Sequence, residues 1–190
     1  CHLKTSVLQS RPMTMMKKNI ALVGFMGAGK TVTSGILASR LGLRRVSTDD
    51  AIIEKEGRSI NAIFADSGEP YFRKVEHAAV AALAGGCGLV IDCGGGVVLN
   101  PENMAALKSS GVVIYLKTSP EVIYERIRHE THRPLLKGED PQQKIQELLK
   151  QRAARYAQAD YTVETDGKSP EQVAEEVVKI FKKGNKGKGE

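Results

Sequence analysis

The feature that most constrains the fold of this chain is a glycine-rich segment, Gly24 to Thr31, that stands between two segments of different periodicity. Its residues are Gly-Phe-Met-Gly-Ala-Gly-Lys-Thr, the pattern of a phosphate-binding loop (P-loop). Residues 20–23 before it form an apolar run suited to a buried parallel strand, and residues 31–41 after it carry apolar side chains at helical spacing. A strand, a tight loop and a helix in this order predict a nucleotide-binding protein of the α/β class.

The residue types of the P-loop explain how it would hold phosphate. Glycines let successive backbone N–H groups point inward at phosphate oxygens, and the following helix adds the positive end of its dipole. The lysine is expected to reach the outer phosphates, and the threonine hydroxyl to ligate the Mg²⁺ that bridges them. The predicted nucleotide-binding residues of this segment are Gly27, Ala28, Gly29, Lys30, Thr31 and Val32.

Length and charge indicate one ordinary domain. With 190 residues, of which 41% are hydrophobic, the chain can bury a sizeable core. Its formal net charge of +6 is concentrated at the two ends, since residues 1–18 carry +4 and residues 179–190 carry +4, which leaves −2 for the body. We therefore expect a domain over residues 19–182, a flexible basic extension before it, a polar basic tail over residues 183–190, and no nucleic-acid partner.

The cysteines and apolar runs indicate the cellular compartment of the protein. Cys1, Cys87 and Cys93 are an odd number without paired metal spacing, so neither a disulfide framework nor a zinc site is indicated, which fits a reducing cytoplasm. No apolar run approaches the length of a membrane span, and the N-terminal segment lacks the hydrophobic core of a signal peptide. We expect a cytoplasmic monomer with no membrane partner.

Periodicity along the chain predicts alternating strands and helices, which implies a parallel sheet wrapped by helices. Apolar runs predict strands near residues 19–24, 44–47, 88–92, 111–116 and 161–164. Helical patterns lie near residues 31–42, 59–65, 69–84, 101–108, 120–130, 141–158 and 170–182. Proline stands at the expected first turn of four helices, at Pro101, Pro120, Pro141 and Pro170.

The polar segment over residues 130–141 is predicted to be a mobile loop, and in an enzyme that transfers phosphate such a loop is a candidate lid. Arginine recognises phosphate and carboxylate bidentately and can stabilise a transferring phosphoryl group. Arg133 in this loop, Arg126 before it and Arg152 after it are therefore candidate ligands. Each of them, taken alone, could equally be a surface residue.

Carboxylates follow two of the predicted strands. Asp49 and Asp50 come just after the second strand, where they would face the same crevice as the phosphates. We assign Asp49 to function, whereas Asp50 is as readily the N-cap of a following helix. Asp92 ends the third strand, in the position of the second magnesium-associated residue of P-loop proteins, although strand-end aspartates also cap turns.

Two further patterns are less specific. Arg73 and Glu76 are three residues apart on one predicted helix, a spacing at which solvated ion pairs are common. The triple glycine Gly94, Gly95 and Gly96 follows the third strand, where it would let a ligand approach the backbone closely, although a plain tight turn uses glycine as well. Neither pattern alone identifies a ligand.

These motifs occur in one order, and the chain resembles the shikimate kinases from about Asn19 to about Phe181. Besides the features above, the resemblance rests on Gly57-Arg58-Ser59-Ile60 followed by Ile63-Phe64, on Phe72-Arg73 with Glu76, on Arg133-Pro134-Leu135-Leu136 and on Arg152 with Tyr156. That family implies a three-layer α/β fold of the nucleoside-monophosphate-kinase type, with five parallel strands in the order 2-3-1-4-5 and a lid. It also implies transfer of the γ-phosphate of ATP, with Mg²⁺, to the 3-hydroxyl of shikimate, a step toward chorismate and the aromatic amino acids.

On the substrate side, the resemblance implies a role for each candidate residue. Asp49 would bind the shikimate hydroxyls and could accept the proton of the attacking hydroxyl. Arg73 and Arg152 would hold the shikimate carboxylate, with backbone contact from Gly95 in the triple glycine. These roles suit a small, polyhydroxylated monocarboxylate, which needs cationic clamps, a carboxylate for its hydroxyls and a lid that excludes water.

On the nucleotide side, the resemblance implies that Arg133 comes from the lid onto the phosphates. Arg126 would stack near the adenine, and Lys168 would lie near the adenine as well. The P-loop lysine keeps the phosphate contact predicted for it above. The expected catalytic residues are Asp49, Lys30 and Arg133.

One departure from the family pattern concerns the metal. Many shikimate kinases carry Asp-x-Asp after the second strand, with the first aspartate near the magnesium, but the matching residues here are Ser47, Thr48 and Asp49. Ser47 cannot supply that charge, and Asp92 precedes the triple glycine where many shikimate kinases have a neutral residue. We predict that the metal-associated carboxylate has moved to the neighbouring strand, which makes Thr31 and Asp92 the candidate metal residues.

Two other functions stay open at this point. A related kinase directed at gluconate or at a nucleotide would share the P-loop and lid, but not Arg73 and Arg152 paired beside Asp49. A non-catalytic binding or regulatory relative typically loses the lysine, the substrate aspartate or the lid arginine. Lys30, Asp49 and Arg133 are all present here.

Overall fold

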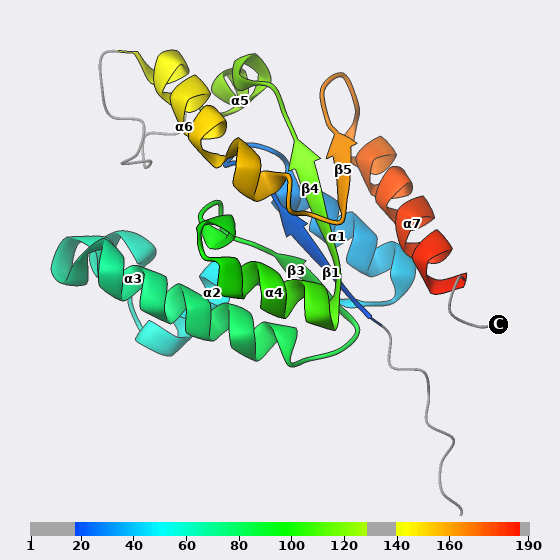
Figure 1. Cartoon of the computed structure of the whole chain (residues 1–190), viewed down its shortest axis with the longest axis horizontal. Helices are drawn as coiled ribbons and strands as arrows, with labels where there is room; N and C mark the ends of the chain where they lie inside the picture. Colours follow the sequence, from blue (N-terminus) through cyan, green and yellow to red (C-terminus); the bar gives the residue numbers. More distant parts are fainter. Residues whose placement is uncertain (1–17, 129–139, 187–190) are drawn as a thin grey trace, which may run out of the picture.

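The core of the protein is a parallel sheet. The computed structural model describes residues 18–128 and 140–186, and within them five strands pair in the order β2-β3-β1-β4-β5 (Figure 1). The strands are β1 Asn19–Val23, β2 Arg44–Ser47, β3 Leu89–Asp92, β4 Gly111–Lys117 and β5 Tyr161–Glu164. Every pairing is parallel. The predicted fold class and strand order are therefore confirmed.

Helices connect the strands, as the alternating pattern predicts. They are α1 Lys30–Leu41, α2 Thr48–Glu56, α3 Ile60–Ala84, α4 Pro101–Ser110, α5 Pro120–Ile127, α6 Pro141–Tyr156 and α7 Pro170–Lys186, with a short 3₁₀ turn at Val97–Leu99. A proline is the first residue of each of the last four α-helices, which confirms that signal. Two expectations were wrong: α2 was not predicted as a helix, and α7 continues past residue 182 to residue 186.

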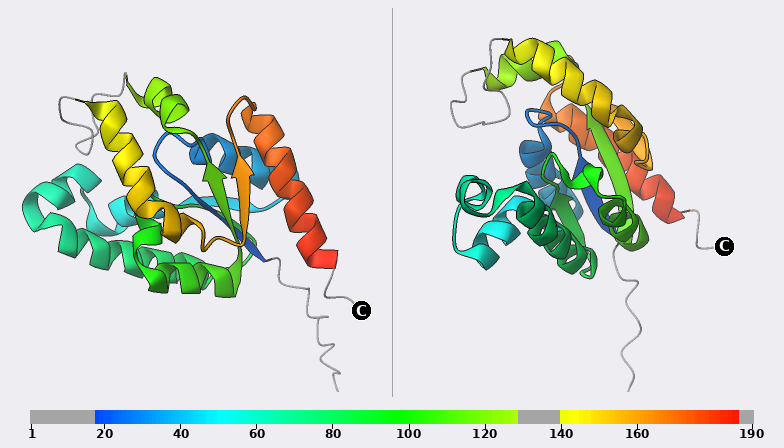
Figure 2. Two further views of the ribbon diagram at one scale, coloured as in Figure 1. Left: turned by 45° about the horizontal axis from the view of Figure 1, so that its top comes forward. Right: turned by 60° about the vertical axis from the view of Figure 1, so that its left-hand side comes forward.

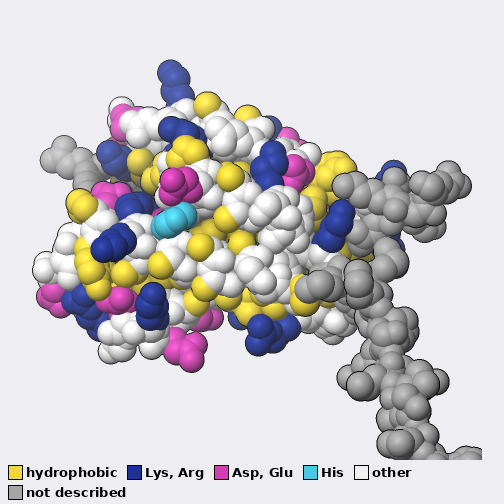
Figure 3. Space-filling model, turned by 60° about the horizontal axis from the view of Figure 1, so that its bottom comes forward, with side chains coloured by type: hydrophobic (Ala, Val, Ile, Leu, Met, Phe, Trp, Pro, Cys, Tyr) yellow, Lys and Arg dark blue, Asp and Glu magenta, His cyan; other side chains and the backbone are white. Residues whose placement is uncertain are grey.

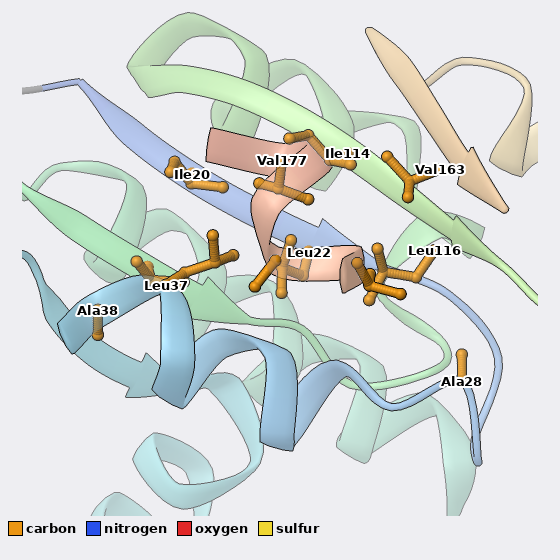
Figure 4. Packing of buried hydrophobic residues seen from close by; sticks show 12 residues of the cluster. Ile20, Leu22, Ala28, Leu37, Ala38, Ile114, Leu116, Val163 and Val177 are labelled. Carbon is orange, nitrogen blue, oxygen red and sulfur yellow. The ribbon is translucent and has the colours of Figure 1, made fainter. Parts of the chain in front are cut away.

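Helices cover both faces of the sheet in three layers (Figure 2). Successive side chains of a strand point to opposite faces, so Ile20 and Leu22 of β1 pack with α1 and α7, as Figure 4 shows. Ala21 and Val23 instead pack with residues of α3, α4 and α6. A central strand that is apolar on both faces is what a sheet covered on both sides requires.

α2 and α3 add a small core of their own beside the sheet (Figure 1). The two predicted helical stretches at 59–65 and 69–84 are the two halves of α3, which meet at Gly68 with φ 76°. Ile52 of α2 packs there against Ile63 and Phe72 from either side of that kink. This arrangement places the second half of α3 next to the triple glycine.

The remaining regions bear on the other expectations. The predicted lid with Arg133 lies outside the described residues, apart from Asp140, which is the N-cap of α6, and Pro141. Residues 1–17 of the predicted N-terminal extension and residues 187–190 of the predicted tail also lie outside them. Among the residues described, no helix is long and apolar enough to cross a membrane. On the face in Figure 3, basic and acidic side chains are interspersed with apolar ones.

Candidate active site

The candidate active site is a crevice at the carboxyl ends of β1, β2 and β3. Each of these strands is followed by one of the predicted motifs: the P-loop follows β1, the aspartate pair follows β2, and the triple glycine follows β3. Residues of all three motifs line a cavity of about 410 Å³, among them Lys30, Asp49, Asp92 and Gly95. Parallel strands thus bring to one sheet edge residues that are far apart in the sequence.

The P-loop has the backbone geometry that its glycines predict. Gly27 and Gly29 have φ of 76° and 84°, a left-handed conformation that favours glycine, and α1 begins immediately after them. The Nζ of Lys30 lies over the loop and donates hydrogen bonds to the carbonyl oxygens of Gly24 at 3.0 Å and Phe25 at 2.9 Å. The loop backbone, the lysine and the start of α1 therefore form one compact site.

The other predicted nucleotide-binding residues, Arg126, Lys168 and Val32, have different neighbours. The Nη1 of Arg126 donates a 3.0 Å hydrogen bond to the carbonyl oxygen of Gly27, so this arginine lies beside the P-loop. Lys168 lies between β5 and α7, where its Nζ is 2.7 Å from Oε1 of Glu176. Val32 lines the cavity and is exposed.

Asp92 contacts the P-loop threonine. The hydroxyl of Thr31 donates a 2.7 Å hydrogen bond to Oδ2 of Asp92, and the Nη2 of Arg45 lies 3.2 Å from the same oxygen. Asp92 is buried and ends β3 directly beside Ser47, its register partner at the end of β2. Positions 47 and 92 are therefore neighbours at the same edge of the sheet, so a carboxylate at either position would lie beside the P-loop.

The first turn of α2 corrects one expectation. Ser47 is the N-cap, because its Oγ accepts a 3.2 Å hydrogen bond from the backbone N–H of Asp50. The alternative considered for Asp50, that it is itself the cap, is therefore wrong. The next residue, Thr48, is buried, and its hydroxyl accepts a 2.7 Å hydrogen bond from the N–H of Gly94. The glycine turn is thus tied to α2 by Thr48, while the side-chain bonds of Asp92 described above go to α1 and β2.

Asp49 points from α2 into the crevice. Burial raises its pKa above the ordinary value of 3.8, Lys30 opposes that rise, and the negative charges of Asp92 and Asp50 add to it. A carboxylate with a raised pKa is a stronger base than a solvated one, because its charged form is less well stabilised. The position and the electrostatics of Asp49 therefore suit a group that accepts a proton from a hydroxyl.

The three consecutive glycines after β3 each contact one of the predicted substrate residues. A Cβ on Gly94 would lie 2.5 Å from Oδ1 of Asp49, and a Cβ on Gly96 would clash with the guanidinium of Arg73. Between them, the carbonyl oxygen of Gly95 accepts a 3.2 Å hydrogen bond from Nη1 of Arg152. Helices α2, α3 and α6 thus bring their functional side chains together around one glycine turn.

Arg73 is held by two carboxylates of its own helix. Its Nη1 is 2.8 Å from Oε2 of Glu76, which confirms the expected pair, and its Nε and Nη2 are 3.2 and 3.0 Å from Oε1 of Glu69. Glu76 is only 2% exposed, so this pair is not the solvated pair that the spacing alone suggested. Burial raises the pKa of Glu76, and the hydrogen bond and charge of Arg73 oppose that rise.

Arg152 is held differently, by a carbonyl and a ring. Besides its bond to Gly95, its guanidinium carbon lies 5.5 Å from the ring centre of Phe25 in the P-loop, a cation–π geometry. The hydroxyl of Tyr156, one turn later on α6, donates to the same carbonyl at 3.4 Å. Arg152 is buried, and through these two contacts it touches both the glycine turn and the phosphate loop.

The sequence reasoning missed three residues that shape the site. Arg45 pairs with Asp92, but nothing in a linear sequence gives the strand register that brings them together. Glu69 is four residues before Arg73 on the same helix, a spacing that does signal an ion pair. Ser47 caps α2, and its place before two acidic residues is a helix-start signal that was available.

Comparison with known proteins agrees with this geometry. The family model for shikimate kinase matches residues 26–182. The shikimate kinase of Thermodesulfovibrio yellowstonii is 42% identical over 171 residues, which cover 90% of this chain and 99% of that protein. The shikimate kinase of Caldanaerobacter subterraneus subsp. tengcongensis is 46% identical over 164 residues, which cover 86% of this chain and 96% of that protein.

A solved structure agrees at the level of the fold. The shikimate kinase from Acinetobacter baumannii in complex with shikimate superimposes with a TM-score of 0.84 at 37% identity, covering 88% of this chain and 94% of that one. The matches span nearly the whole described domain, from the P-loop to α7. The chain belongs to the shikimate kinase family.

Proposed function

We propose that this chain transfers the γ-phosphoryl group of ATP to the 3-hydroxyl of shikimate in the crevice described above. Its family makes it an ATP-dependent kinase of shikimate, acting in aromatic amino acid biosynthesis. The observation that carries the proposal is the convergence of Asp49, Arg73 and Arg152 on three successive glycines beside the P-loop. One carboxylate and two guanidinium groups around a narrow turn match a small acid that carries several hydroxyls.

In this proposal, Asp49 orients the attacking hydroxyl and accepts its proton. The raised pKa of Asp49 supports the role, since a base in a dry site accepts a proton more readily than one in water. Lys30 stands near enough to affect that pKa, so the phosphate end and the hydroxyl end of the reaction are adjacent. Most of the rate would come from holding the two substrates in line.

Arg73 and Arg152 are proposed to hold the shikimate carboxylate from two sides of the glycine turn. Arg73 is kept in place by Glu69 and Glu76, and Arg152 by the carbonyl of Gly95. Side chains that are already fixed lose little conformational freedom when the substrate binds. The carboxylate would therefore set the orientation of the ring, and the hydroxyl would be presented to Asp49.

The nucleotide would lie along the P-loop. Residues Gly27 to Val32, which include Lys30, would contact the phosphates. Arg126 and Lys168 would lie near the adenine. Arg133, from the segment outside the described residues, would close onto the phosphates as part of the lid. The glycine conformations support the assignment of the loop, and the contact of Arg126 with Gly27 supports that of Arg126.

The donor set of the crevice fits Mg²⁺. This ion is usually bound through one or two protein groups together with substrate phosphates and waters. The hydroxyl of Thr31 and the carboxylate of Asp92, 2.7 Å apart, are the groups that would hold it. When bound, the ion would neutralise charge on the phosphates.

A substrate comparison tests the proposal. ADP release, measured with a coupled assay, should be rapid with shikimate and slow with quinate, gluconate and nucleoside monophosphates. The Asp49→Asn variant, which has nearly the same shape, is the control that links turnover to this crevice. Preferred turnover of gluconate or of a nucleotide, or shikimate turnover that Asp49→Asn leaves unchanged, would contradict the proposal.

A further inference from the structure

Four polar residues from three elements form a closed ring of hydrogen bonds beside the P-loop. Thr31 and Arg45 both donate to Oδ2 of Asp92, at 2.7 and 3.2 Å. The Nε of Arg45 donates to the hydroxyl of Ser34 at 2.9 Å, and that hydroxyl donates to the carbonyl oxygen of Thr31 at 2.9 Å. The ring therefore joins the first turns of α1 to Arg45 within β2 and to the end of β3.

Strand register explains how Arg45 reaches this place. Arg45 is two residues before Ser47 on β2, so the two side chains share a face, and Ser47 is the register partner of Asp92. The register partner of Arg45 itself is Val90, which packs in the cluster between the sheet and α1. Arg45 thus lies on the face covered by α1, whereas its neighbour Arg44 faces the other way.

Charge explains why a cation is needed there. Asp92 is 6% exposed, and a buried carboxylate is costly unless it is paired and hydrogen-bonded. A second carboxylate, Asp49, is close enough for the charge of Asp92 to raise its pKa. Two negative groups in a crevice that receives a polyphosphate would repel it, and Arg45 offsets one of them.

The ring also fixes how Asp92 is oriented. Both donors bind the same oxygen, Oδ2, and Oδ1 takes no part in the ring. Arg45 is in turn held by Ser34, which is fully buried, so the guanidinium cannot turn away without breaking a second bond. A carboxylate held in this way presents a constant face to the hydroxyl of Thr31 and to the space beside it.

We propose that Arg45 is a positioning residue for magnesium: it holds Asp92 against Thr31 and balances its charge, and so strengthens the binding of the metal–nucleotide complex. This inference rests on the proposed metal role of Asp92. Two of its side-chain nitrogens bind Asp92 and Ser34, so we assign its effect to the position and charge of Asp92. Residues that orient a metal ligand typically change metal affinity by 10–100-fold when they are removed.

Calorimetric titration with ADP tests this, performed once with excess Mg²⁺ and once with EDTA. Arg45→Met should weaken ADP binding on the order of tenfold in Mg²⁺ and hardly at all in EDTA. Arg45→Lys, which keeps the charge but cannot bond both partners, should lose less and guards against a folding defect in Arg45→Met. Arg44→Met, on the opposite face of the same strand, is the matched control and should match the wild type in both conditions.

The Asp92→Asn variant separates this inference from the proposed function. If Asp92 serves the metal, Asp92→Asn weakens ADP binding only in Mg²⁺, and adding Arg45→Met to it causes no further loss. Equal losses in Mg²⁺ and EDTA for Arg45→Met, or an additive loss in the double variant, would overturn the role of Arg45 and leave that of Asp92 intact. If Asp92→Asn binds ADP like the wild type in both conditions, the metal role of Asp92 is wrong and the role of Arg45 is wrong with it.

Discussion

The two ends of the crevice are built in different ways. At the phosphate end, one contiguous loop supplies the backbone groups, and its own lysine and threonine supply the side chains. At the substrate end, Asp49, Arg73 and Arg152 come from three helices and meet only at the triple glycine. The first end is defined by local conformation, whereas the second depends on how α2, α3 and α6 pack.

This difference determines how each end of the crevice should respond to a substitution. A contiguous loop that loses one side chain keeps its backbone groups, so it can still contact phosphate through them. An assembled site has partners held by other partners, so that removing one charge leaves another uncompensated. Substitutions at the substrate end should therefore combine functional and structural effects, and the following experiments separate the two.

The largest effect is expected from Asp49→Asn. Turnover should fall by about 10²–10⁴-fold, the usual contribution of a general base, while the KM values for ATP and shikimate change little. Steady-state kinetics with each substrate varied in turn would measure this. A fall of less than about tenfold would mean that Asp49 only binds hydroxyls, and that the assembled end positions the substrate without taking its proton.

The same variant should be more stable than the wild type at neutral pH. The pKa of Asp49 is raised in the folded protein, so its ionisation opposes folding increasingly as the pH rises from the unfolded-state pKa to the folded-state pKa, and asparagine removes this cost. The gain should shrink as the pH falls, and it should vanish below the unfolded-state value of 3.8, where both side chains are neutral. Thermal unfolding at pH 7 and at pH 4 measures it, and a constant difference between the two would contradict the electrostatic explanation.

The next effect compares the two arginines. Arg73→Ala and Arg152→Ala should each cost about 2–5 kcal/mol of shikimate binding, because each leaves a charge without its partner in a partly dehydrated site. The KM for shikimate should rise far more than the KM for ATP. Equal changes for both substrates would mean that the arginines support the structure and do not clamp the carboxylate.

Stability should distinguish these two variants. Arg73→Ala leaves the buried Glu76 unpaired and should lower the free energy of unfolding by about 1–3 kcal/mol. Arg152→Ala should cost less, since Tyr156 still donates to Gly95. Adding Glu76→Gln to Arg73→Ala should restore stability but not the KM for shikimate. If it restores both, Arg73 acts only through Glu76.

Alanine substitutions in the triple glycine give a finer comparison. A Cβ at Gly94 or Gly96 would collide with Asp49 or Arg73, whereas the nearest atom to a Cβ at Gly95 is 3.6 Å away, an ordinary contact. Gly94→Ala and Gly96→Ala should raise the KM for shikimate by the equivalent of about 1–3 kcal/mol, and Gly95→Ala should be mild. Similar losses for all three would show that the turn matters for its backbone and not for the approach of the side chains.

The smallest effect is expected from removing the ends of the chain. The residues placed in the crevice all lie between residues 18 and 186, so a chain of residues 18–186 should keep its turnover within about twofold, as surface changes usually do. Steady-state kinetics and thermal unfolding would show this. A large loss in either measurement would mean that a tail contributes to one of the two ends.

The contrast between the phosphate end and the substrate end of the crevice also explains what could be predicted from the sequence. The P-loop is contiguous, so its glycine conformations and the start of α1 follow from pattern alone. The substrate residues were identified through a family resemblance, because Arg73 and Arg152 are 79 positions apart in the sequence and each looks like a surface residue. The structure brings them to the same turn, which no local pattern encodes.

Two errors have a simple physical origin. α2 was overlooked because Asp49 was considered for its function and Asp50 was considered as a cap, although Ser47 before them and Gly57 after them, with φ 67°, are a helix start and stop. The burial of Glu76 was not foreseen, since the spacing of an ion pair says nothing about what covers it. The first error could therefore have been avoided from the sequence, whereas the burial of Glu76 depends on tertiary packing, which sequence periodicity does not report.

The pairing of Ser47 with Asp92 across two strands has a consequence for how such proteins are recognised. A search pattern written along the chain treats these positions as unrelated, being 45 residues apart, and rejects a sequence in which one of them lacks its acid. A pattern written across the sheet would treat the two as alternatives and would accept an acid on either strand. Homologues classed as defective because one position is neutral deserve a second inspection at its cross-strand neighbour.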